Sequence, residues 1–278
     1  MFTTNPFSEL SGFISPLAMQ IYVVAMIALV ILGTLIDVIH KKSAKYFFEA
    51  GQKAQKNATR TVGGGEKVGL AIKTVTSEVL TSSEFCSVRR RISHLLTMYG
   101  FILFVVSTAA LIFAYPTKAD AGIWSGLWHL GAAMLCLGGY WFWFFIRVDV
   151  SAEGKRWYQL ARADIFIVSL LTTATFALLW SATMGESANL LLFALFVVSS
   201  TLLFSTVLWS KFAHMFFKPA AAFQKKITKA DGSRENLPAD YDLTDPAVQA
   251  KYPDIPEYMG KTPPYMGLGI KREAPKHY

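Results

Sequence analysis

Charged residues are scarce in this chain, and their scarcity excludes an ordinary soluble domain. Asp, Glu, Lys and Arg make up 17% of the 278 residues, whereas hydrophobic residues make up 53% and phenylalanine alone occurs 21 times. The mean hydropathy is positive, at +0.36. Such a composition is typical of an integral membrane protein.

Cysteine is nearly absent, and the common catalytic motifs do not occur. Cys86 lies in a basic segment and Cys136 inside an apolar run, so the pair suggests neither a disulfide framework nor a CxxC metal site. No Cys and His stand at zinc-site spacing, and the chain contains no GxGxxG, Walker or GxSxG motif. The sequence therefore carries no local signature of a zinc site, a nucleotide-binding loop or a serine hydrolase.

The apolar segments lack runs of charge, which argues against a pump or a voltage sensor. The two halves of the chain also lack inverted repeats with broken helices, which argues against a transporter. The net charge is +8, but the cations flank apolar runs instead of forming one soluble basic face. We therefore expect a membrane as the partner of these cations and no nucleic acid.

What the chain does contain is a series of apolar runs. The first has 24 residues, about 36 Å of helix, and it lacks the basic start and cleavage site of a signal peptide, so we expect it to remain as a membrane helix. We predict an all-α membrane protein, a bundle of five transmembrane helices within residues 17–218. The expected spans are 17–40, 94–115, 123–146, 165–183 and 188–214.

The distribution of cations predicts the orientation of this bundle. With the N-terminus outside and the C-terminus inside, 26 of the 27 Lys and Arg residues lie on the inner side, and only Lys118 lies outside. Residues 1–16 would then be a short outer lead, and residues 41–93 a basic cytoplasmic loop. We expect a multi-pass protein of the bacterial cytoplasmic (inner) membrane.

The loop and the C-terminal segment are the expected docking surfaces for a soluble partner. Within the loop, helical patterns over 44–58 and 68–85 flank a break at 63–65, and the second pattern is expected to lie on the inner membrane face or on a partner. Pro219 is expected to end the last helix. The Pro-rich tail 219–278 would be extended and would gain order on cytoplasmic oxidoreductase subunits.

Histidines at the inner ends of the helices are the candidates for cofactor chemistry. A b-type haem needs two imidazoles from facing helices at equal depth, and His94 and His214 meet that requirement. Arg90, Arg91 and Lys211 stand beside them as candidate partners for the haem propionates. The alternative is that interfacial histidines only cap helix ends or face lipid head groups.

Three further polar residues leave alternatives open. His40 could replace either haem ligand, or it could stabilise a propionate or the end of the first helix. His129, near the outer side, could bind a quinone head group or be an ordinary interface histidine. Asp37 could relay protons to quinone or pair with Lys41.

Two motifs resemble a known family. The stretch VLTSSEFCSVRRRISHLLTMYGF (79–101) resembles the start of the second helix in membrane cytochrome b subunits of the nitrate reductase gamma type, including heterodisulfide-reductase-like complexes. The stretch WSKFAHMFFKP (209–219) resembles the closing element of the same family. The resemblance implies a five-helix subunit that exchanges electrons between a cytoplasmic enzyme and quinone, with His94 and His214 as ligands of the inner haem.

The chain departs from this family where the ligands of an outer haem would stand. Phe104 and Phe196 occupy those positions, so we expect one haem b instead of two. The short chain and its basic, Pro-rich tail are most similar to membrane proteins associated with dissimilatory adenylylsulfate reductase in sulfur oxidisers. We therefore expect a membrane anchor and electron-transfer subunit for a flavin and iron–sulfur enzyme, itself not catalytic. The competing hypothesis is a structural anchor without a cofactor.

Overall fold

The computed structural model describes residues 3–41, 43–83, 85, 87–148, 156–207, 214–233 and 245–251, with the side chains of 38, 41, 43–48 and 214–217 left out of the description. Within these ranges every regular element is a helix, apart from an isolated antiparallel bridge between Thr4 and Asp120. The prediction of an all-α chain is confirmed for this part of the protein.

Four helices are long and apolar enough to cross a membrane. They are α2 (Pro16–Lys41), α5 (Val88–Phe113), α6 (Ile123–Trp141) with the π-helix η2 (Phe142–Ile146), and α7 (Ile165–Ala182) with the short 3-10 helix η3 (Arg162–Asp164) before it. These helices confirm the prediction of a membrane protein. A run of apolar side chains favours a helix in lipid because the helix satisfies its own backbone hydrogen bonds.

The fifth apolar helix is shorter than predicted. We expected a span over 188–214, but α8 (Asn189–Ser205) has 17 residues, and a separate helix, α9 (His214–Ala230), follows. A helix of that length rises about 26 Å, slightly less than a hydrocarbon core of about 30 Å. A fifth crossing therefore remains a prediction, together with the orientation that depends on it.

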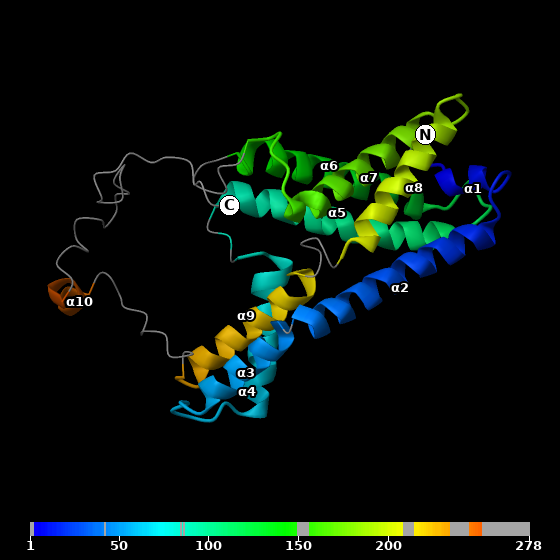
Figure 1. Ribbon diagram of the computed structural model, residues 1–278. Coiled ribbons are helices and arrows are strands. Elements are labelled where there is room, and N and C mark those ends of the chain that lie inside the picture. The colour runs from blue at the N-terminus through cyan, green and yellow to red at the C-terminus, as the bar shows by residue number, and fades with distance from the viewer. Residues whose placement is uncertain are drawn as a thin grey trace.

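Helices α5, α6 and α7 lie side by side, α8 packs against α7, and α2 crosses diagonally along α8 and α5 (Figure 1). We call the end of this bundle that carries Arg89–Arg91 the inner end, and the opposite end the outer end. Glycines bring α5 and α6 close together, since Gly100 and Gly131 each face the backbone of the other helix. Small residues at an interface let two helix backbones approach closely, and such packing contributes to helix association in lipid.

Gly131→Ala is expected to lower the free energy of unfolding by about 1–3 kcal/mol, because the interface has no room for a methyl group. An added Cβ would lie 2.6 Å from the backbone nitrogen of Phe104 and 2.9 Å from the carbonyl oxygen of Gly100. Thermal unfolding in detergent measures the effect. Gly126→Ala is the matched control, since the same helix leaves open space there. Equal losses in the two variants would contradict the interpretation.

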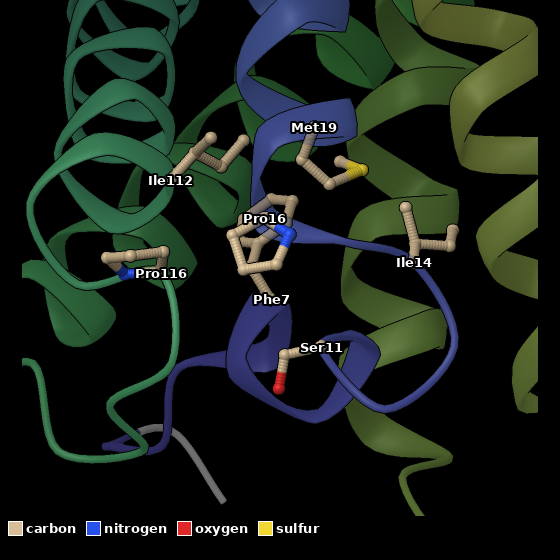
Figure 2. Close-up of a pocket in the computed structure, with 7 residues that line it drawn as sticks. All are labelled: Phe7, Ser11, Ile14, Pro16, Met19, Ile112 and Pro116. Carbon is tan, nitrogen blue, oxygen red and sulfur yellow. The ribbon is translucent and has the colours of Figure 1, made fainter.

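The N-terminal lead folds over the outer end of the bundle. Asn5 caps α1 (Pro6–Leu10), and its Nδ2 donates to the carbonyls of Tyr115 at 2.8 Å and Lys118 at 3.2 Å. The Phe7 ring then lies edge-on to Trp128 and Trp180. Figure 2 shows the small, mainly apolar pocket that remains between α1, the start of α2 and the end of α5. Its lining residues are Phe7, Ser11, Ile14, Pro16, Met19, Ile112 and Pro116.

At the inner end a second group of helices lies beside the bundle (Figure 1). We call it the inner platform; it comprises α3 (Ser43–Gln55), α4 (Gly64–Thr74), the π-helix η1 (Val75–Leu80) and α9. Lys226 of α9 lies 3.2 Å from Glu78 and donates to Ser77 Oγ at 2.8 Å. Helix α9 is thereby fastened to α4 and η1. The predicted break at 63–65 lies earlier in the structure, since α4 already begins at Gly64.

The turn between α3 and α4 is fixed by its own polar contacts. Thr59 N donates to Asp231 O at 2.9 Å, which joins the turn to the end of α9. Arg60 donates to both carboxylate oxygens of Glu66 in the first turn of α4, at 3.0 and 2.5 Å. These hydrogen bonds lower the pKa of Glu66. A negative charge at this position also suits the positive end of the α4 dipole.

The prediction that Pro219 ends the last helix was wrong. Pro219 is the sixth residue of α9, which continues to Ala230 and packs on α3 and α4. A proline inside a helix loses one backbone hydrogen bond, a cost that packing can offset. Residues 219–230 are therefore not an extended tail. Beyond them the structure describes the short helix α10 (Pro246–Lys251), while the rest of the predicted docking tail lies outside the described residues.

Candidate functional site

His94 lies in the second turn of α5 at the inner end of the bundle. Its Nδ1 is 3.0 Å from Ser82 Oγ, and its ring lies 4.9 Å from the Phe85 ring between centroids. Ser82 is buried and has a φ of 48°, a left-handed conformation that is uncommon for a residue other than glycine. Ser82 and Phe85, which stand between η1 and α5, therefore both lie against His94.

Cations surround the aromatic ring that contacts His94. The Arg90 guanidinium carbon and the Lys218 ammonium nitrogen each lie 5.4 Å from the centroid of the Phe85 ring. Lys218 belongs to α9, so the beginning of α9 lies next to the beginning of α5. His214, one helical turn before Lys218, is the first residue of α9, but its side chain lies outside the description.

The residues predicted to bind the haem propionates make different contacts in the structure. Arg90 contacts Phe85, as described above, whereas Arg91 donates from Nε to the carbonyl of Thr81 at 2.7 Å and so fastens the same segment to α5. Lys211 lies outside the described residues. Of the two described arginines, Arg90 contacts the ring beside His94, and Arg91 bonds the residue before Ser82.

The remaining predicted residues of the inner end lie on α2. His40 is exposed near the end of this helix, and Asp37, about one turn earlier, is buried. Lys41, the predicted partner of Asp37, has a side chain outside the description. Neither the proton-relay role nor the pairing with Lys41 is tested by these positions.

His129 connects two membrane helices. Its Nδ1 lies 2.7 Å from the Ser125 carbonyl, which can only accept, so this nitrogen carries the proton. Its Nε2 then accepts from Ser181 Oγ of α7, also at 2.7 Å. The histidine is buried, and both ring nitrogens have protein partners. This geometry favours a structural contact between α6 and α7 over quinone binding, which would have to displace one of these bonds.

Phe104 and Phe196, which stand where outer haem ligands were sought, do come together in space. Their ring centroids are 6.4 Å apart and the rings are perpendicular. Trp128 and Trp180 pack against them, with Trp128 5.3 Å from Phe104 and Trp180 stacked 5.6 Å from Phe196. All four are buried. These four rings form one buried aromatic cluster that joins α5, α6, α7 and α8.

An ion pair that the sequence analysis did not anticipate lies at the inner end. Arg147, fully buried after η2, donates to the Asp164 carboxylate at 2.6 Å, to the Arg156 carbonyl at 2.9 Å and to the Gln159 carbonyl. Its guanidinium carbon also lies 4.2 Å from the centre of the Trp143 ring. In the sequence analysis Arg147 is only one of the 26 cations counted on the inner side. The sequence did carry a signal for this pair. A cation follows one predicted span and a carboxylate precedes the next span, so both lie on the same side of the membrane.

Within the described residues, no three His, Cys, Asp or Glu side chains converge as they would around a bound metal ion. A haem with two axial histidines does not require such a group. In comparisons with protein-family models, curated proteins and solved structures, no match to this chain was found.

Proposed function

We propose that this protein is a membrane anchor that passes electrons between a cytoplasmic flavin and iron–sulfur oxidoreductase and membrane quinone through one haem b, with His94 and His214 as axial ligands. The observation that carries the proposal is the surroundings of His94. At the inner end of α5, His94 contacts a serine hydroxyl and an aromatic ring, and that ring in turn lies near cations from two helices.

The described residues fit such a group. A ligating histidine coordinates through one ring nitrogen while the other is held by a hydrogen bond, and Ser82 Oγ provides that bond at Nδ1. Arg90 and Lys218, both beside the Phe85 ring, would supply positive charge for the propionate carboxylates. When bound, a haem of this type supplies one-electron transfer.

The remaining parts of the proposal concern topology and partners. Helix α8 would complete a fifth crossing, so that the N-terminus lies outside and the inner platform faces the cytoplasm of a bacterial cell. The platform and the tail would dock the soluble enzyme, for which adenylylsulfate reductase is the proposed candidate. Asp37 and His40 lie on the side from which quinone would receive protons.

The second candidate function is a structural anchor without a cofactor. It is favoured by the fact that Ser82 and Phe85 could serve His94 equally well as ordinary packing partners. A pyridine haemochrome assay and a reduced-minus-oxidised spectrum of the purified full-length protein separate the two functions. We expect a b-type spectrum at about one haem per chain. A folded protein without a b-type band would contradict the electron-transfer proposal.

A further inference from the structure

An apolar stripe runs along the outward face of α4 and η1. Val68 and Ile72 are each 60% exposed and Val75 is 49% exposed. Their spacing of four and three residues puts them on one side of a helix. The opposite side faces α9, because Thr74 is buried there and Ser77 and Glu78 contact Lys226. The stripe is therefore not the face by which α4 joins the inner platform.

The end of η1 is held along the first turns of α5, next to the water edge. Tyr99 of α5 donates its hydroxyl to the carbonyl of Leu80, the last residue of η1, at 2.7 Å. Arginines mark the water edge of a membrane helix. Tyr99 is eight residues beyond Arg91, about 12 Å further along the helix. Arg91 in turn donates to the carbonyl of Thr81, the residue after Leu80, so the end of η1 lies against α5 at the water edge.

Charge around the stripe matches an anionic surface. Lys67 and Lys73 are exposed, and each stands next in sequence to a stripe residue, about 100° around the helix from it and on opposite sides of the stripe. The acidic residue in the first turn of α4, Glu66, is paired with Arg60. An apolar stripe between lysines is the pattern of a helix that lies in the plane of a membrane interface.

We propose that α4 and η1 form an interfacial helix that binds the inner leaflet. Val68, Ile72 and Val75 enter the boundary between head groups and acyl chains, about 5–10 Å deep in comparable helices. Lys67 and Lys73 contact the phosphates of anionic lipids. Lipid is the occupant because the bonds from Tyr99 and Arg91 hold the end of η1 at the water edge of α5, where the membrane interface lies. The proposal does not depend on the haem.

Depth-dependent fluorescence quenching tests the proposal in the full-length protein. With Cys86→Ser and Cys136→Ser as background, a bimane label is placed at Ile72→Cys and the protein is reconstituted into nanodiscs that contain anionic lipid and doxyl-labelled lipid. The matched control is Lys225→Cys, an exposed position on α9, which packs on the opposite side of α4. We expect quenching about twofold or more stronger at position 72 than at position 225.

Equal quenching at the two positions would overturn the proposal, as would a label at position 72 that is shielded only after a soluble protein partner is added. A second arm tests the charges. Lys67→Gln with Lys73→Gln is expected to weaken the quenching at position 72 in anionic nanodiscs and to leave it unchanged in zwitterionic ones. Unfolding curves that match the background protein confirm that the labelled variants are folded.

Discussion

Arg147→Met is expected to lower the free energy of unfolding by about 3–5 kcal/mol, the largest loss of stability predicted for this protein. Methionine is long enough to pack on Trp143, so the loss comes from charge and not from a cavity. Without the guanidinium, the carboxylate of Asp164 stays buried with only the amide of Ala161 at 2.8 Å as a described partner. Two loop carbonyls each lose one donor, although that of Arg156 keeps the amide of Gln159.

The measurement is thermal unfolding in detergent, combined with a double-mutant cycle. Arg147→Met with Asp164→Leu should recover much of the lost stability, because removing both charges leaves no unpaired ion in an apolar site. Arg156→Gln is the surface control, since Arg156 is exposed and bonds Tyr158, and its effect should be small. Strictly additive losses in the double variant would show that Arg147 and Asp164 are not coupled.

His94→Ala is expected to abolish the low-spin b-type spectrum, and His214→Ala should do the same, because loss of either axial ligand leaves the haem iron without its bis-histidine coordination. His40→Ala and His129→Ala should retain the spectrum. His129 is the most informative of the controls, since it is buried and bonded on both ring nitrogens but lies on the outer side of the bundle.

Ser82→Ala tests the residue that forms a hydrogen bond with the proposed ligand His94. It should keep the haem but shift its reduction potential, because the bond at Nδ1 tunes the basicity of the ligating imidazole. Folding of each variant is checked by its unfolding curve. If His94→Ala keeps the full spectrum while His40→Ala loses it, the ligand assignment is wrong and the site moves to the end of α2.

The long apolar runs identified α2, α5, α6 and α7 as membrane helices. The length of an apolar run is a local property of the sequence, and a run long enough to cross the hydrocarbon core is stable in lipid. The ends of the last elements were not readable in this way. Pro219 normally marks a helix end, but α9 passes through it, since packing on α3 and α4 supports the helix. A propensity rule ignores such tertiary contacts.

The same distinction between local sequence and tertiary packing applies to the candidate site. The sequence by itself indicated His94 and its neighbouring arginines, because charge next to an apolar run marks the membrane edge. Only the tertiary structure decided that Ser82 and Phe85 contact His94, that Arg147 pairs with Asp164 and that Phe104 meets Phe196. Hydropathy acts on each segment separately, whereas hydrogen bonds and ring contacts require two segments to be brought within a few ångströms by the packing of the whole bundle.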